Sequence, residues 1–245
     1  MSFLVVAMGA TSVAAATAYI VRRTKATDIP TAFLKALASL CFVALGLVSA
    51  AKGARTQEAL AAVMGLVMCL VGDIFLSVNS SCAGVAGASS GADGAAEGSL
   101  PTRSPWTYGG FVAFMLGHLC FVAFMLGDGA LLLLPAAILI GLAGGVFIYQ
   151  TPRILGLKLG GIRLLTACYS TVIFTATALA VLRAALQGGP AATFFAMGYV
   201  LFLLSDIVLA AIMFTDGRNT PRYNVLNLVP YYAGQNLIAL SLLWL

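Results

Sequence analysis

Residues 66–78 read LVMCLVGDIFLSV, and residues 200–214 read VLFLLSDIVLAAIMF. Each stretch is apolar around one aspartate, Asp73 in the first and Asp206 in the second, and each aspartate follows a small residue and precedes an isoleucine. A carboxylate at membrane depth is costly, so an acidic residue within a membrane helix marks a candidate functional site. The two stretches therefore indicate a helical membrane protein and the place where its function should be sought.

Composition supports the same class. Hydrophobic residues make up 61% of the 245 residues and charged residues only 9%, whereas a soluble domain is about 25% charged. The chain is therefore a polytopic membrane protein. Its basic residues are explained by membrane topology, because they lie mainly in the connections on one side. The sequence has no basic stripes interleaved with aromatic residues, so we expect no nucleic-acid partner.

The fold predicted is all-α, a single transmembrane domain over residues 1–245. Apolar runs long enough to cross a hydrocarbon core of roughly 30 Å predict eight spanning helices, at about 3–21, 32–51, 58–78, 108–127, 130–149, 162–186, 191–214 and 225–245. These helices leave no room for a soluble catalytic domain. Any active site must be built from helix side chains and short loops.

Basic residues fall unevenly on the two sides of this arrangement. The first, third, fifth and seventh connections carry nine lysines and arginines, and the opposite side carries only Lys52, Arg55 and Arg183. Cytosolic loops of membrane proteins carry the excess of basic residues. Both chain ends should therefore face the lumen or exterior.

One segment of low complexity, residues 79–104, contains mainly Gly, Ala and Ser. Its side chains are too small and too polar to form a buried apolar face. The segment is therefore predicted to be a disordered cytosolic loop with no role in catalysis. The five cysteines show no C-x-x-C and no Cys/His spacing typical of metal sites. We therefore predict no metal and no cofactor.

Polar residues in the other spans gather in one half of the membrane. Counting 1.5 Å per residue from the helix ends places in or near the cytosolic half, together with Asp73 and Asp206, the residues Lys35, His118, Tyr169, Tyr231, Tyr232 and Gln235. This pattern predicts a polar chamber that opens toward one leaflet.

The two aspartate segments also suggest an internal repeat. Gly72-Asp73-Ile74 resembles Ser205-Asp206-Ile207, and Gly117-His118 resembles Gly234-Gln235. Lys35 precedes Asp73 by 38 residues, and Tyr169 precedes Asp206 by 37. Two four-helix halves of parallel topology would produce this spacing, and chance similarity between short apolar strings would also produce it.

Several motifs resemble those of the membrane lysoplasmalogenases, the YhhN-like family. They are GDIFL (72–76), FMLGHLCF (114–121), ACYSTVIF (167–174), LLSDIVLAAIMF (203–214) and YYAGQNLIAL (231–240). The resemblance implies an eight-helix hydrolase that cleaves the vinyl ether bond of lysoplasmalogens, lysophospholipids taken from the bilayer. The products would be a fatty aldehyde and glycerophosphoethanolamine or glycerophosphocholine. The family also leads us to expect the endoplasmic reticulum membrane, although the charge pattern fits a plasma membrane equally.

The chemistry fits these residues. Vinyl ether hydrolysis needs an acid to protonate carbon and a base to take a proton from water, and two carboxyl groups in unlike surroundings can divide such roles. We expect Asp73 and Asp206 to be this pair, in either order. His118 could activate the water or hold an aspartate, or it could be a hydrogen-bonded packing residue.

Substrate binding would fall to the remaining polar residues. Tyr169, Tyr231, Tyr232 and Gln235 could orient substrate or water, although tyrosines also serve as interfacial anchors. Lys35 could bind the substrate phosphate or extend toward lipid headgroups.

Three other functions are considered. A proton-coupled transporter would use intramembrane carboxylates and repeats, but the segments with Asp73 and Asp206 contain no proline that would break a helix. An intramembrane aspartyl protease would need Gly-x-Gly-Asp, and residue 70 is Leu. Ser205 lacks the G-x-S-x-G turn that a Ser-His-Asp hydrolase would need.

The orientation can be tested without reference to function. Glycosylation acceptor sites placed before Ser2 or after Leu245 should be modified, because both ends are predicted to face the lumen, and sites within 85–100 should stay unmodified. Gel-shift analysis after glycosidase treatment reads the result. The reverse pattern would invert the topology.

Overall fold

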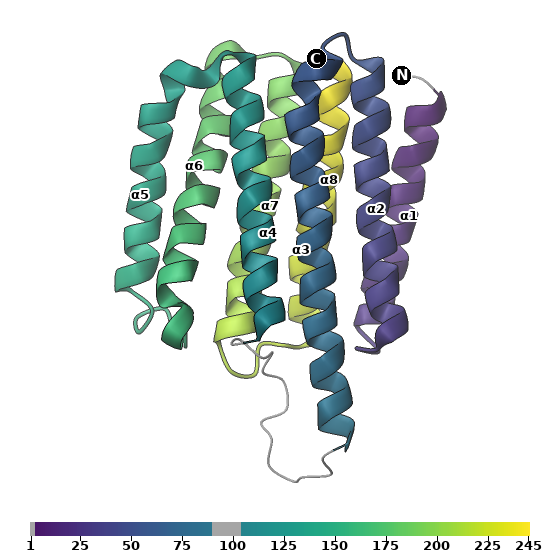
Figure 1. Ribbon diagram of the computed structural model, residues 1–245, viewed down its shortest axis with the longest axis vertical. Helices are drawn as coiled ribbons and strands as arrows, with labels where there is room; N and C mark the ends of the chain where they lie inside the picture. Colours follow the sequence, from purple (N-terminus) through teal and green to yellow (C-terminus); the bar gives the residue numbers. More distant parts are fainter. Residues whose placement is uncertain (1–2, 90–103) are drawn as a thin grey trace.

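The computed structural model describes residues 3–89 and 104–245, and at Thr56 and 81–89 it describes the backbone alone. Eight long helices stand side by side in a bundle (Figure 1): α1 Phe3–Arg23, α2 Ile29–Lys52, α3 Thr56–Ser89, α4 Pro105–Met125, α5 Leu134–Gln150, α6 Arg163–Gln187, α7 Pro190–Phe214 and α8 Pro221–Ser241. No strand occurs in the described residues. The all-α prediction is confirmed.

Most of these helices are apolar and long enough to cross a membrane. Six segments meet both conditions, and one of them, Pro105–Gln150, runs through both α4 and α5, so the six segments include seven of the eight helices. The chain is a multi-pass membrane protein. Helix α8 does not qualify, because polar residues such as Asn224, Asn227 and Asn236 occupy its buried face.

The loop predicted over 79–104 is wrong in its first part, because α3 continues through these residues to Ser89. The segment contains Gly84 and Gly87 but no proline before Pro101. A glycine costs a helix only about 1 kcal/mol relative to alanine, whereas proline costs about 3. The rest of the predicted loop, residues 90–103, lies outside the described residues.

Glycines bring neighbouring helices into close contact. A Cβ atom added to Gly198 of α7 would lie 2.7 Å from the carbonyl oxygen of Gly234 in α8. A Cβ atom added to Gly141 of α5 would lie 2.6 Å from the carbonyl oxygen of Thr171 in α6. Small residues at such contacts let helix backbones approach within the membrane, where no hydrophobic effect drives helices together.

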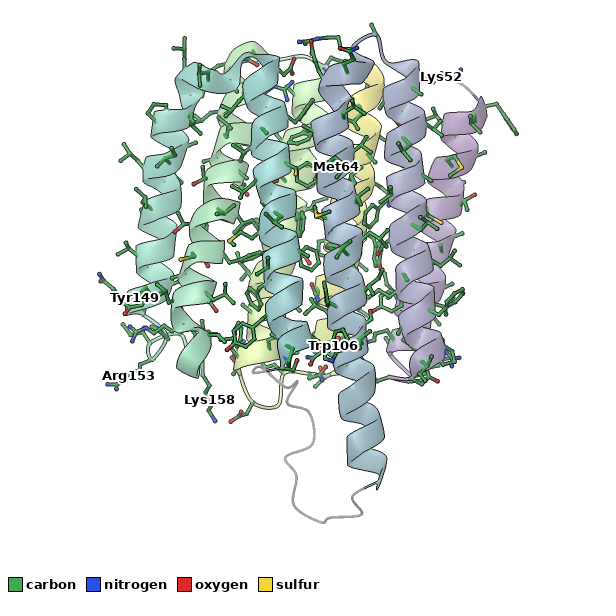
Figure 2. All side chains as sticks on the ribbon, viewed as in Figure 1. Lys52, Met64, Trp106, Tyr149, Arg153 and Lys158 are labelled. Carbon is green, nitrogen blue, oxygen red and sulfur yellow. The ribbon has the colours of Figure 1, made fainter. Side chains whose placement is uncertain are left out.

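The two ends of the bundle differ in charge. The two chain ends lie at the same end (Figure 1), where the backbone N–H of Ala54 donates to the carbonyl of Leu245. Lys52 lies at this end, whereas Arg153 and Lys158 lie at the opposite one (Figure 2). This arrangement matches the predicted sidedness of the connections, and which end faces the cytosol stays a prediction.

The α7–α8 contact gives a stability prediction. Gly198→Ala should lower the free energy of unfolding by about 1–3 kcal/mol, as overpacking does elsewhere, because its methyl group would meet the backbone of Gly234. Thermal unfolding of the purified protein in detergent measures the effect. Gly9→Ala in α1 is the control, since no atom of the described residues lies within 4 Å of a Cβ added there. Equal melting temperatures of the two variants would contradict the close contact.

Candidate functional site

Asp73 lies in a cluster built from α2, α3 and α8. Its side chain is 2% exposed. One carboxylate oxygen is 3.0 Å from the Lys35 ammonium nitrogen, and the other accepts hydrogen bonds from the hydroxyls of Ser39 and Tyr231, each at 2.6 Å. Three donors, one of them charged, therefore surround this carboxylate.

Asp206 belongs to a second cluster, built from residues of α4, α6 and α7. The Tyr169 hydroxyl donates to Asp206 Oδ2 at 2.5 Å, and the Tyr169 oxygen lies 3.2 Å from His118 Nε2. His118 Nδ1 lies 3.1 Å from the Tyr199 hydroxyl. Because Tyr169 gives its proton to Asp206, its oxygen is left to accept from the histidine, which assigns the proton of the neutral ring to Nε2.

Phe202 of α7 lies between the two clusters. Its ring centroid is 4.9 Å from that of His118 and 5.3 Å from that of Tyr231. The structure thus brings six of the sequence-predicted residues into two neighbouring clusters.

The other two predicted residues, Tyr232 and Gln235, are buried in α8. Tyr232 packs edge-on against Tyr19 with centroids 5.9 Å apart. Its hydroxyl lies near Ser39 but makes no hydrogen bond of normal geometry to any described residue. Gln235 lies beside the Cys69 thiol, and among the described residues neither its amide nitrogen nor its oxygen makes a hydrogen bond of normal geometry. Buried polar groups are usually paired, so both side chains have capacity for a bound molecule or water.

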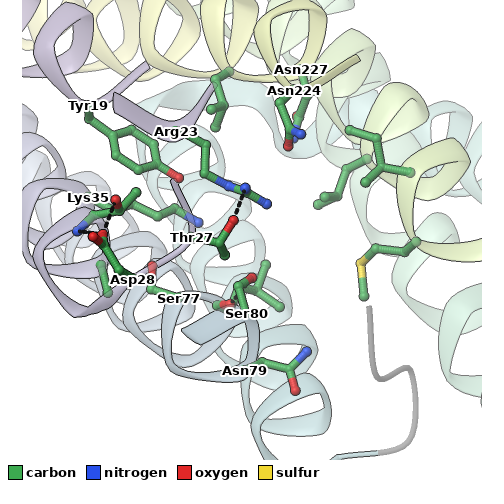
Figure 3. Close-up of a pocket in the computed structure, with 17 residues that line it drawn as sticks. Tyr19, Arg23, Thr27, Asp28, Lys35, Ser77, Asn79, Ser80, Asn224 and Asn227 are labelled. Carbon is green, nitrogen blue, oxygen red and sulfur yellow. Dashed lines mark hydrogen bonds between the residues drawn. The ribbon is translucent and has the colours of Figure 1, made fainter. Parts of the chain in front are cut away.

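A small polar cavity of about 60 Å³ lies among α1, α2, α3, α7 and α8. Two cations, Arg23 and Lys35, reach into it, and its walls include Tyr19, Asn224 and Ser80 (Figure 3). The cavity therefore suits a polar, negatively charged group.

A larger apolar cavity of about 290 Å³ lies among α3, α4, α5, α6 and α7. Phe111, Phe174 and Leu203 are typical of its lining, and Asp206 and Tyr169 are among its few polar wall residues. Its volume is near the lower end of the roughly 300–1,000 Å³ found for small-molecule sites. The two cavities share three lining residues, Leu76, Leu209 and Met213, so they are neighbours.

Sequence reasoning missed four residues that contact this site: Tyr19, Arg23, Ser39 and Tyr199. One of them had a signal in helix periodicity: Ser39 follows the predicted residue Lys35 by four positions, which places both on one helix face. Ser205 donates to Asn227 Oδ1 at 2.6 Å. This pairing, without His118, argues against a Ser-His-Asp hydrolase.

Comparison with protein families decides what the chain is related to. The model of the YhhN family matches residues 30–242. The chain belongs to the YhhN family. No curated protein and no solved structure matches it.

The YhhN match confirms the resemblance seen in the sequence motifs, and it includes both aspartate clusters. Helix α1, with Tyr19 and Arg23, precedes the matched residues. Within the described part of the chain, His, Cys, Asp and Glu side chains form no group of three or more that could hold a metal ion.

The Lys35–Asp73 pair gives a second stability prediction. Asp73→Asn should destabilise the protein by about 3–5 kcal/mol, because a buried ammonium loses its counter-charge. Lys35→Met combined with Asp73→Asn should recover most of the loss, since no unpaired charge then remains. Melting temperatures in detergent provide the measurement.

Asp216→Asn is the matched control, because the Lys158–Asp216 pair is about 70% exposed on both sides and exposed pairs contribute only about 0–1 kcal/mol. A loss for Asp73→Asn no larger than that of the control would contradict a buried ion pair.

Proposed function

We propose that this protein hydrolyses the vinyl ether bond of lysoplasmalogens, releasing a fatty aldehyde and glycerophosphoethanolamine or glycerophosphocholine. The observation that carries the proposal is Asp206 in the wall of an apolar cavity that adjoins a polar, cationic one. A lysoplasmalogen has the same division: an apolar alkenyl chain, a reactive ether and a charged headgroup. Membership of the YhhN family supports this reaction class.

The contacts of the two aspartates support different roles. Asp73 is buried, and its carboxylate oxygens already receive three donors, including an ammonium. Asp206 is partly exposed, borders an apolar space and receives one neutral hydroxyl. We assign the acid to Asp206 and a fixed negative charge to Asp73.

The reaction follows from these roles. Asp206 gives its proton to the vinyl carbon remote from the oxygen, and the double-bond electrons form the new C–H bond, which leaves an oxocarbenium ion. Asp73 stabilises the positive charge. Water adds to the cationic carbon and returns a proton to Asp206, and the resulting hemiacetal breaks its C–O bond to give aldehyde and alcohol. One water is consumed and the acid is regenerated.

His118 has a positioning role in this proposal. It contacts the hydroxyls of Tyr169 and Tyr199 and not a carboxylate, so it acts on Asp206 through Tyr169. Gln235, whose amide makes no hydrogen bond of normal geometry within residues 3–89 and 104–245, is proposed to hold the attacking water. Tyr231 and Lys35 keep Asp73 in place, and Tyr232 packs beside them.

The eighth span and the repeat also belong to the proposal. Helix α8 packs against α1, α2 and α7, and with these neighbours around its polar face it can cross the membrane. Lys35 contacts Asp73 and Tyr169 contacts Asp206, so positions at matching spacings make matching contacts. This supports two four-helix halves of parallel topology.

We also propose that the protein resides in the endoplasmic reticulum membrane.

A proton-coupled transporter is the second candidate, favoured by Pro230 inside α8, since proline can interrupt a membrane helix where a pathway passes. Purified protein in detergent separates the two functions. Release of aldehyde from lysoplasmalogen needs no membrane compartments, whereas transport does.

Asp206→Asn should reduce aldehyde release at least about 10²-fold, because an amide cannot supply the proton. Its melting temperature should stay near wild type, since in the described part of the chain a single hydroxyl, that of Tyr169, bonds Asp206. The assay measures kcat in detergent, with Asp216→Asn as the control at an exposed aspartate. Retention of more than about a tenth of the wild-type kcat, against that expected 10²-fold loss, would exclude Asp206 as the acid.

A further inference from the structure

Arg23 in the last turn of α1 extends into the polar cavity (Figure 3). One guanidinium nitrogen donates to the Thr27 hydroxyl at 2.8 Å. Within residues 3–89 and 104–245, no carboxylate forms an ion pair with it. The guanidinium also lies within reach of the Tyr19 hydroxyl, and its remaining N–H donors are available to a bound group.

The other charges around this cavity are paired. Lys35 pairs with Asp73 at 3.0 Å, and Asp28 pairs with Arg22 at 2.7 Å. Hydrogen bonds from Thr31, followed by the charge of Arg22, lower the pKa of Asp28 below its usual value, so that carboxylate is ionised at neutral pH. Arg23 thus contributes one uncompensated positive charge to the cavity.

The hydroxyls beside Arg23 have partners within their own helix. Ser77 donates to the Asp73 carbonyl and Ser80 to the Leu76 carbonyl. The Asn224 amide nitrogen donates to Asn219 and to the Thr220 carbonyl. The guanidinium is therefore the main source of available donors, and planar guanidinium groups bind phosphate oxygens in a bidentate manner.

We propose that the polar cavity is a binding subsite for a singly charged phosphodiester, held by Arg23. The inference rests on the proposed function for the rest of the ligand: the phosphodiester belongs to a lysolipid headgroup whose chain occupies the adjoining apolar cavity. Leu76, Leu209 and Met213, which line both cavities, lie where the headgroup joins the chain. Arg23 precedes the residues matched by the family model, so this assignment comes from the geometry of this chain.

The charge balance sets a preference among ligands. A phosphodiester carries one negative charge and matches the single free cation. A phosphomonoester carries about −1.5 to −2 at pH 7, and a glycerol ether without phosphate carries none. The subsite should therefore favour diester headgroups over monoester headgroups and over uncharged ones.

Binding of a saturated ether analogue, 1-O-alkyl-glycerophosphocholine, tests the subsite apart from catalysis, because this lipid has no vinyl ether to hydrolyse. Its Kd is measured by calorimetry on purified protein in detergent for wild type, Arg23→Gln and Lys25→Gln. Lys25 is exposed and outside the cavity, so both variants lose one positive charge from the same connection. Arg23→Gln should raise Kd at least about tenfold and Lys25→Gln should not.

Two further ligands complete the design. 1-O-alkylglycerol should bind all three proteins equally, and inorganic phosphate should fail to displace the lipid at concentrations near the lipid's Kd. Arg23→Lys keeps the positive charge but loses the planar guanidinium, so its Kd should lie between those of wild type and Arg23→Gln. This variant replaces Arg23→Gln in the test if Arg23→Gln does not fold.

An unchanged Kd for Arg23→Gln would overturn the subsite, as would an equal loss for Lys25→Gln, which would indicate attraction by general charge. Displacement by inorganic phosphate would overturn the assignment to a lipid diester. If the analogue binds through Arg23 while lysoplasmalogen releases no aldehyde, the proposed reaction is wrong and the subsite stands. If aldehyde release has the same KM in Arg23→Gln, the reaction stands and the subsite is wrong.

Discussion

A carboxylate inside a helical membrane bundle must be given hydrogen-bond donors, and this requirement organises the centre of the protein. Asp73 obtains its donors from α2 and α8, and Asp206 obtains its donor from α6, with α4 one contact behind. Each donor lies on a different helix from the carboxylate that it serves. The two aspartates therefore hold four other helices in register, because displacing any of these helices would leave a charged or polar group unpaired in an apolar surrounding.

Small residues beside the aspartates make these contacts possible. A Cβ atom at Gly72 would lie 2.6 Å from the Phe114 ring of α4, so the glycine lets that ring pack against α3. Phe114 in turn contacts Phe202 and Tyr231 with centroids 6.2 and 6.3 Å apart. The resulting aromatic layer separates the two carboxylate clusters, which lets one aspartate lie among charged and polar partners while the other borders an apolar cavity. Different surroundings for two identical side chains are what acid–base chemistry needs.

At the end of the bundle where the two chain ends lie, ion pairs join the helices. Asp128, in the turn between α4 and α5, pairs with Arg55 at the start of α3 and with Arg183 near the end of α6. Arg183 is 4% exposed and lies over the Phe124 ring at 5.5 Å. This network ties the α4–α5 turn to α3 and α6. The two cavities lie toward the other end of the bundle, and an opening of the proposed chamber toward one side of the membrane stays a prediction.

The sequence by itself determined the class of the protein, the approximate limits of its helices and the identity of the polar residues at its centre, because apolar length and the cost of buried charge are local properties. It also supplied the family resemblance, since the motifs are contiguous. It did not determine where α3 ends, because Gly-rich segments without proline do not fix a helix end. The partners of each aspartate, the unpaired amide of Gln235 and the cavity around Arg23 were decided by tertiary structure alone. These features join residues that are distant in the chain, and helix periodicity gives the face on which a residue lies but not the helix that it meets.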